Sequence, residues 1–501
     1  MKTLISGHSQ ILKDIAGYST SAVLGQALGL ISGFVVARLL GPSNFGVWNA
    51  VSLVLAYGAY SEAGILSAMG RDLPFYLGQG DFHKAQELEN AGVVITLAGG
   101  GVVALVVLGL SFWPGCSSLM ALGLRGMAMV LVLQQAYTYH RTVLRSYNEF
   151  GALSRQQVLL AVLNATLAIA LVAGLGFAGR VAAAILAQAA ILFYAVRLRP
   201  WKAISIPNWQ VGWHLARVGL PILISGFILS LLATVDRLIV ITFLGETQLG
   251  YFGLALILAS IVSLIPTMAS QVLYPRITYR YGETNKDIHA LRPFVLIPPI
   301  VFSCLLPLLI GPLYLALPLM IKTFLPAYVP GIGAMRILLL GIFFFSILGL
   351  TDYLLVVIGK LKQLMLFGCL ALTLDIVLDL VFIRLGFGIE GIALGGTLIT
   401  YFCYACVIIG YALSHYTRQL GDWVRYFSKL FWPYAYMVGL LFLLERWGNL
   451  PGASGITGDV LTVGLQMVLF GLGCLPLVYA ASRELKLEWS LAQLVRLKGA
   501  L

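Results

Sequence analysis

The 501-residue chain is 60% hydrophobic and carries only 10% charged residues, with a mean hydropathy of +0.93. Soluble domains carry about 25% charged residues, so this composition excludes a soluble globular protein and predicts a chain embedded in a membrane almost throughout. The net charge of +12 would suit a nucleic-acid-binding protein, but the basic residues are spread along one side of the predicted membrane topology.

Fourteen apolar segments are long enough to cross a bilayer, whose hydrocarbon core needs about 20 apolar residues per helix. Their apolar residues are continuous rather than alternating, which predicts an all-α polytopic membrane protein and excludes a closed barrel. The first segment can span and has no convincing cleavage site, so no cleavable signal peptide is expected. The segments cover residues 15–37, 46–69, 91–113, 119–138, 156–176, 181–197, 217–244, 247–273, 292–316, 332–357, 364–384, 389–412, 430–446 and 458–481.

Lysine and arginine set the orientation of these spans. With the N-terminus inside, 24 of the 32 basic residues lie in inner segments, 5 in outer loops and 3 within spans. Basic residues concentrate on the cytoplasmic side, so both termini are expected in the cytoplasm. Attraction to anionic lipid then accounts for the net charge, and the bilayer rather than nucleic acid is the expected partner.

No catalytic, metal or cofactor site is expected from the motifs. The outer loops are short and leave no room for a soluble catalytic domain, and no GxxxxGK[ST] motif for ATP occurs. The histidines, among them His214, lie scattered in inner segments. Cys403 and Cys406 have CxxC spacing but lie inside an apolar run, where they are expected to be packing residues.

Two stretches of the chain repeat at a nearly constant offset. LLGPSNFGVWNA is matched by FLGETQLGYFGLA, and RDLPFYLGQGDFHKA by RITYRYGETNKDIHA. The repeat predicts two six-helix bundles of the same orientation, at 1–206 and 207–412, followed by a final helix pair and tail at 413–501. Such parallel repeats suit alternating access, in which one bundle rocks against the other. The matched pairs are Gly41 and Gly245, Gly46 and Gly250, Arg71 and Arg276, Tyr76 and Tyr281, and Ala85 and Ala290.

Eight charged residues fall inside the predicted spans, where a charge costs roughly 2.5–3.5 kcal/mol and usually faces a cavity or a partner. Arg125 lies near the outer end of its span and is expected to snorkel or pair, and Asp352 is expected near the cytoplasmic interface. The set comprises Glu62, Arg125, Asp236, Arg237, Arg336, Asp352, Asp375 and Asp379.

Asp236 and Arg237 are neighbours in an apolar run. Adjacent residues on a helix point about 100° apart, so the two are not expected to neutralise each other directly. Either Arg237 contacts an anionic group of a substrate, or Asp236 carries a proton, or the two belong to a buried structural ion-pair network.

Asp375 and Asp379 are four residues apart and therefore share one helix face. Their mutual repulsion would be relieved by a shared proton, by a bound cation or by a salt bridge from Arg336 or Arg384. A role in ion coupling is one of these alternatives.

Arg71 and Arg276 are equivalent in the repeat and follow spans at their inner ends. Arginine suits phosphate oxygens, so the pair could attract a diphosphate head group at an inward-facing mouth. Anchoring at the inner membrane surface explains the same residues equally well.

ARLLGPSNFGVWNAV and RDLPFYLGQGD resemble the N-terminal signature of bacterial polysaccharide flippases, and GLPILISGFILSLLATVDRLIVITFLGETQLGYFGLALIL resembles the start of their second half. YPRITYRYGE and LGFGIEGIALGGTLIT fit the same pattern. The chain thus resembles the Wzx-like family of the multidrug/oligosaccharidyl-lipid/polysaccharide exporter superfamily, whose members have 12–14 helices in two bundles.

The resemblance implies transport of an undecaprenyl-diphosphate-linked oligosaccharide to the periplasmic leaflet for lipopolysaccharide O-antigen or exopolysaccharide biosynthesis. Polysaccharide polymerase and export components are the protein partners it implies. It favours Glu62, Asp236 and Arg237 as cavity-lining residues, with Arg71 and Arg276 at the mouth. The alternatives are a proton- or sodium-coupled multidrug exporter and a lipid II flippase, although the first helix lacks the arginine cluster of lipid II flippases. A glycan polymerase or ligase is disfavoured, because no outer loop is long or contains histidine.

Overall fold

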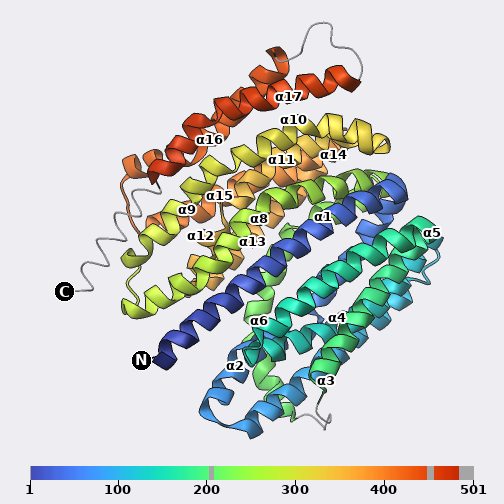
Figure 1. The fold of residues 1–501 in the computed structure, drawn as a ribbon, viewed down its shortest axis with the longest axis vertical. Helices are drawn as coiled ribbons and strands as arrows, with labels where there is room; N and C mark the ends of the chain where they lie inside the picture. The colour runs from blue at the N-terminus through green and yellow to red at the C-terminus, as the bar shows by residue number, and fades with distance from the viewer. Residues whose placement is uncertain (1, 202–207, 448–455, 485–501) are drawn as a thin grey trace. The chain divides into compact units, whose positions relative to one another are not determined.

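The computed structural model describes residues 2–201, 208–447 and 456–484, and these residues form helices with no β-strand among them (Figure 1). This confirms the expected all-α polytopic fold. The chain packs into two compact units, Met1–Gly253 and Leu254–Leu501, each with its own core. The predicted repeat boundary at 206/207 and the tail at 485–501 lie outside the described residues.

Twelve helical stretches in the described chain are long and apolar enough to cross a membrane. Two of them, Thr20–Glu62 and Phe150–Leu198, have 43 and 49 residues, which is enough for two crossings each. Each contains one glycine with positive φ where two helices join, at Gly41 (φ 73°) and Gly176 (φ 56°). Counting both arms of each accounts for the fourteen predicted spans.

The first unit is built around the packing of α1 on α5 and of α3 on α4. Small and branched apolar side chains fill the contact between α3 and α4, for example Ala104 and Val107 against Ala128 and Leu131. Many other apolar side chains on α3 are exposed, as expected for a surface that faces lipid. The helices of this unit are α1 (Lys2–Gly58), η1 (Ala59–Glu62), α2 (Ile65–Gln79), α3 (Phe82–Leu110), α4 (Ser118–Ser146), α5 (Phe150–Leu198), α6 (Trp209–Leu232), α7 (Val235–Phe243) and the start of α8 (Glu246–Glu283).

Repeat-equivalent residues meet in the first unit. Gly41 and Gly245 both have a positive φ (73° and 87°), a backbone angle that favours glycine at both positions. A Cβ atom on Gly46 would overlap the Glu246 carbonyl, and a Cβ on Gly250 would overlap the Pro42 carbonyl. In the repeat, Pro42 corresponds to Glu246 and Gly46 corresponds to Gly250. The two contacts are therefore reciprocal, as at a twofold axis.

A cluster of polar contacts fastens the opposite end of this unit. Arg199, at the end of α5, lies 3.7 Å from the Glu89 carboxylate of α3 and 3.3 Å from that of Glu149. Its guanidinium stacks 3.6 Å from the ring centre of Tyr147, whose hydroxyl donates to Glu89 at 2.7 Å. We call these four residues the Arg199 clasp; it joins α3, α4 and α5 immediately before the chain leaves for α6.

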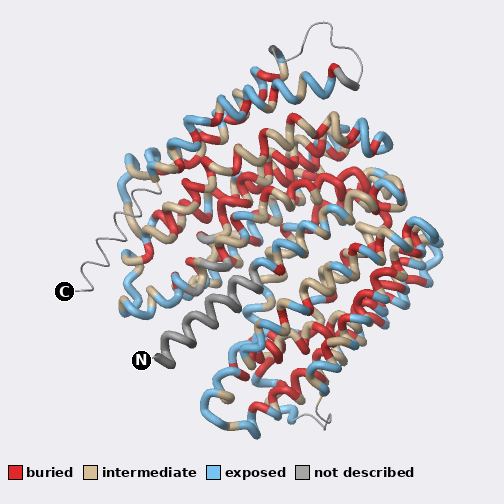
Figure 2. Tube along the Cα trace, viewed as in Figure 1, coloured by how far each residue is buried: buried red, intermediate tan, exposed pale blue. Residues whose placement is uncertain are grey.

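The second unit has its most buried residues along the helices before the final pair. Figure 2 shows buried residues concentrated on α10, α11 and α15, whereas α16 and α17 have far fewer buried residues. The helices are η2 (His289–Leu291), α9 (Arg292–Leu305), α10 (Pro307–Phe324), η3 (Pro326–Gly331), α11 (Ile332–Ser346), α12 (Gly349–Val357), α13 (Leu361–Arg384), α14 (Gly388–Ile392), the π-helix η4 (Ala393–Thr400), α15 (Tyr401–Ser414), α16 (Leu420–Trp447) and α17 (Ile456–Gly473).

Candidate functional site

Four of the seven predicted site residues lie in one part of the first unit, where α1, η1 and α2 run against α6 and α7. They are Glu62, Arg71, Asp236 and Arg237. We call this contact the seam. The other three predicted site residues, Arg276, Asp375 and Asp379, belong to the second unit.

Two tyrosines of α1 and η1 hold the middle of the seam. The Tyr57 hydroxyl lies 2.9 Å from that of Thr234, and the Tyr60 hydroxyl donates to the Gly226 carbonyl at 3.0 Å. The rings of Tyr57 and Tyr60 also pack edge-on against Phe227 of α6, with centroids 6.3 and 5.1 Å apart. These contacts fix where α6 lies against the first helices.

Glycines allow the two helices to cross further along the seam. A Cβ on Gly64 would overlap the backbone of Gly219, and a Cβ on Gly219 would overlap the backbone of Gly64. Such backbone-to-backbone approach is typical of small residues in membrane helix pairs. Along the seam, later residues of the segment from α1 to α2 contact earlier residues of α6, so the two sides run antiparallel.

The structure corrects the expected environment of Glu62, which does not lie inside a continuous helix. The second span breaks at η1, and Ala63 and Gly64 follow with left-handed backbones (φ 53° and 82°). Glu62 is buried, and its carboxylate accepts from the Leu66 backbone N–H at 2.7 Å. Glu62 therefore caps the first turn of α2, a position where a negative charge is favourable.

The expected helix over residues 217–244 is also broken. It begins earlier, at Trp209, and is interrupted at residues 233–234 before α7 starts at Val235. Thr234 takes part in two side-chain contacts at this break, with the Ser230 carbonyl (2.6 Å) and the Tyr57 hydroxyl (2.9 Å). A helix interrupted at membrane depth exposes backbone groups that suit a polar binding site.

Asp236 and Arg237 directly follow this break. Asp236 is buried in the first turn of α7, where a carboxylate favours the helix N-terminus. Arg237 is only half-buried, and its backbone N–H donates to the Thr234 carbonyl at 3.1 Å. The expectation that the two residues need different partners stays a prediction.

Arg71 lies at the end of the seam where the predicted inner segments gather. Its Nε donates to Asp72 at 2.6 Å, and this hydrogen bond raises the pKa of Arg71 above its ordinary value. The other carboxylate oxygen of Asp72 lies 3.3 Å from Nε2 of His214 on α6. The Arg71 guanidinium is exposed, but its hydrogen bond to Asp72 restricts the side chain to one orientation.

The predicted ion-coupling residues lie on α13. Asp375 and Asp379 are both fully buried and share one helix face. Arg336 does not supply their salt bridge, because it pairs with Glu445 at 2.9 Å and stacks 4.6 Å from the ring centre of Tyr314.

Three other charged residues singled out in the sequence lie in different surroundings. Arg276, the repeat partner of Arg71, is exposed on α8. Asp352 is half-buried, and one of its carboxylate oxygens is buried and has no hydrogen-bond partner among the described residues; its place near the cytoplasmic interface stays a prediction. Arg125 donates from Nε to the Ser111 hydroxyl at 3.3 Å and stacks on Phe112, the pairing expected for it.

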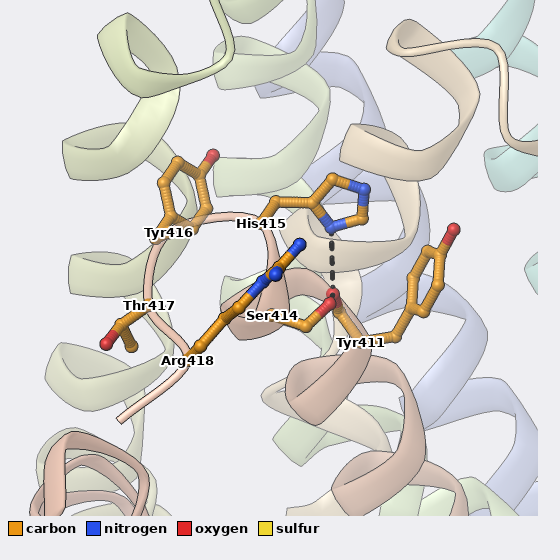
Figure 3. Close-up of a pocket in the computed structure, with 6 residues that line it drawn as sticks. All are labelled: Tyr411, Ser414, His415, Tyr416, Thr417 and Arg418. Carbon is orange, nitrogen blue, oxygen red and sulfur yellow. Dashed lines mark hydrogen bonds between the residues drawn. The ribbon is translucent and has the colours of Figure 1, made fainter. Parts of the chain in front are cut away.

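A polar pocket of about 520 Å³ opens at the end of α15, lined by residues 411 and 414–418 (Figure 3). Its polar groups serve the helix end, since Ser414 Oγ donates to the Tyr411 carbonyl at 2.7 Å and His415 Nδ1 lies 2.9 Å from the same oxygen. Such contacts satisfy the last carbonyls of a helix. The partial negative charge of a helix C-terminus disfavours an anionic ligand there, so this pocket is not the candidate site.

Sequence reasoning did not identify Tyr57, Tyr60, Asp72 or His214. Two glycines flank the break in GAYSEAG, which is a signal for an interrupted helix. Nothing in the sequence pairs Asp72 with His214, which lies 142 residues away.

Comparison with known proteins agrees with this architecture. The model of the polysaccharide biosynthesis protein family matches residues 11–279, more than half of the chain. No match is found among curated proteins.

Three solved structures share the fold. An inward-facing multidrug resistance MATE family transporter of the MOP superfamily is 17% identical, with a TM-score of 0.65 over 78% of this chain and 94% of that chain. The lipid II flippase MurJ in an inward closed conformation is 13% identical, with a TM-score of 0.68 over 91% and 97%. A MOP superfamily transporter from Pyrococcus furiosus is 16% identical, with a TM-score of 0.53 over 80% and 95%. The chain therefore has the fold of MOP superfamily membrane transporters and belongs to the polysaccharide biosynthesis protein family.

Proposed function

We propose that this protein is a flippase that moves an undecaprenyl-diphosphate-linked oligosaccharide from the cytoplasmic to the periplasmic leaflet of the bacterial inner membrane by alternating access. The family match supports a role in polysaccharide biosynthesis. The fold is that of membrane transporters, one of which is named as a flippase of lipid II. The distribution of basic residues supports a cytoplasmic location for both termini.

The observation that carries the proposal is the pair of broken helices in the seam. Helix breaks at η1 and at Thr234 present backbone polar groups and charged side chains inside predicted spans. A diphosphate head group that crosses a bilayer needs such a polar path, because the hydrocarbon offers it no partner. Arg237, half-buried after the second break, is assigned to the diphosphate, with Asp236 as its supporting contact and Glu62 nearby along the seam.

Arg71 and Arg276 are assigned to the cytoplasmic mouth, where they would receive the diphosphate before transport. Asp375 and Asp379 are proposed as the ion-coupling residues, since both carboxylates are fully buried on one face of α13. The two repeat halves, 1–206 and 207–412, are proposed as the moving bodies, and polysaccharide polymerase and export components as partners in the membrane.

Deletion of the gene tests the proposal. We expect loss of surface polysaccharide and accumulation of lipid-linked oligosaccharide in the inner leaflet, restored by the wild-type chain. Arg237→Ala should restore export less well than Arg125→Ala at equal protein levels, because Arg125 already has its partners at the end of α3. Normal surface polysaccharide in the deletion strain would refute the function, and equal export by the two variants would refute the assignment of Arg237.

A cation-coupled multidrug exporter is the rival function, favoured by the buried carboxylates of α13 and by the fold shared with a MATE family transporter. It predicts that the deletion strain becomes more susceptible to cationic drugs while its surface polysaccharide stays normal. The two functions therefore give opposite results in the same strain.

A further inference from the structure

Asp72 is a buried carboxylate at the inner end of the seam, and both of its oxygens are engaged. Oδ1 accepts from Arg71 Nε at 2.6 Å, and Oδ2 lies 3.3 Å from His214 Nε2. Asp72 is only 8% exposed, whereas the side chains of its two partners are 59% and 58% exposed. A buried carboxylate is costly unless it is hydrogen-bonded, so Asp72 needs both partners.

Arg71 uses only one of its three nitrogens in this contact. Its terminal amino groups, Nη1 and Nη2, have no partner among the residues that the structure describes. The edge formed by these two groups can bind two phosphate oxygens at once. Asp72 therefore holds the guanidinium by its Nε and leaves this edge available for an anion.

His214 fixes the carboxylate that fixes Arg71. The next residue, Leu215, is fully buried in a cluster with Ile65 and Ala68 of α2, which anchors the backbone of His214. Without the imidazole, Oδ2 would lose its only partner among the described residues. Asp72 and Arg71 could then rotate together, and the outer edge of the guanidinium would lose its fixed direction.

We propose that Arg71 is the contacting group of a phosphoryl-binding site, that Asp72 and His214 are its positioning residues, and that its ligand is the diphosphate of the lipid-linked substrate. This inference rests on the proposed function, because only a diphosphate-linked substrate brings that group to the mouth. The same chemistry would bind the phosphate of a bulk anionic phospholipid, so the test includes both sources.

The experiment uses the full chain in nanodiscs of phosphatidylcholine, titrated with farnesyl diphosphate or with glycerol 3-phosphate as a stand-in for a phospholipid head group. We expect the wild-type protein to prefer farnesyl diphosphate. Arg71→Gln should weaken that binding roughly tenfold, the loss expected for one charge-assisted contact. His214→Ala should weaken it about threefold or more, because the contacting group remains but is no longer aimed.

Two further variants separate positioning from general effects. His214→Gln can still donate to Oδ2 through its amide, so it should restore most of the wild-type affinity. Arg217→Gln removes an exposed positive charge from the same helix, three residues away, and should leave the affinity unchanged. Thermal unfolding of each variant shows whether it is folded. If His214→Ala is not folded, the binding by Arg71→Gln, His214→Gln and Arg217→Gln decides whether the inference stands.

The inference would be overturned if wild type and His214→Ala bound with equal affinity, or if His214→Gln bound no better than His214→Ala. It would also be overturned if Arg217→Gln lost as much affinity as His214→Ala. Equal affinity of the wild type for glycerol 3-phosphate would overturn the assignment to the substrate diphosphate and assign the site to bulk lipid. Absence of binding by the wild type would also overturn the inference. The proposed function is decided separately, by export in the deletion strain.

Discussion

Glu62 provides a test that separates a structural hydrogen bond from a functional charge. Its carboxylate accepts from the Leu66 N–H at 2.7 Å, and the residue is 6% exposed. Glu62→Ala removes the acceptor and leaves a buried amide at the start of α2 unsatisfied, which costs about 1–3 kcal/mol. Glu62→Gln keeps an oxygen acceptor of the same reach and loses only the interaction of the charge with the helix N-terminus, about 0.3–1 kcal/mol.

The two variants are compared by the thermal unfolding midpoint of the purified protein in one detergent and by export at matched protein levels. We expect Glu62→Ala to unfold at a clearly lower temperature than wild type, and Glu62→Gln to unfold close to wild type. If the charge also serves transport, Glu62→Gln should be folded but deficient in export.

Equal destabilisation by the two substitutions would refute the reasoning, because the charge rather than the accepted hydrogen bond would then hold the turn. Wild-type stability of Glu62→Ala would refute it as well, since the cap would then contribute nothing. Full export by Glu62→Gln would leave the cap as the residue's whole role.

Two other predictions concern stability. Gly219→Ala should lower the unfolding midpoint, since the added Cβ would overlap the Gly64 backbone before α2 and such overpacking costs about 1–3 kcal/mol. Gly226→Ala on the same helix is its control, because that Cβ would lie 3.7 Å from its nearest neighbour; equal midpoints would contradict the close crossing. Arg199→Met should cost about 1–3 kcal/mol, because it removes the ion pairs and the ring stacking of the Arg199 clasp and leaves buried Glu89 without its cation. Arg145→Met, which removes an exposed charge of the same unit, should have little effect, and a clasp variant as stable as this control would contradict the prediction.

The spans and the repeat could be predicted because each depends on local sequence. A continuous apolar run decides that a helix crosses the membrane, whatever it packs against. The repeated glycines mark backbone positions that other residues rarely adopt, and Gly41 and Gly245 both have a positive φ. Both features need no knowledge of distant contacts.

The helix breaks and the charge partners depend on contacts that a single sequence does not contain. Ala63 adopts a left-handed backbone although it carries a Cβ, a strained conformation that surrounding packing has to maintain. A salt bridge from Arg336 to Asp375 or Asp379 is plausible from the predicted spans, but Arg336 pairs with Glu445 near the end of α16. Continuous helices were therefore expected where the structure has interruptions, and the interruptions are where the predicted site residues Glu62, Asp236 and Arg237 lie.

The reciprocal glycine contact has a consequence for alternating access, because it joins the ends of the first unit opposite its basic segments. Opening toward that side has to separate Gly250 from Pro42. In Gly250→Val the side chain would overlap the Pro42 carbonyl, at a cost of about 1–3 kcal/mol to the closed contact. A change of this size shifts a two-state equilibrium by roughly 5- to 150-fold.

The test uses a cysteine placed at buried Val47 in a cysteine-free background. In Gly250→Val this cysteine should react faster with a membrane-impermeant thiol reagent than in the protein that keeps Gly250. Gly29→Val, whose Cβ would meet no neighbouring atom within 4 Å, should leave the reaction rate unchanged. Equal rates in the two variants would mean that this contact does not control access from that side.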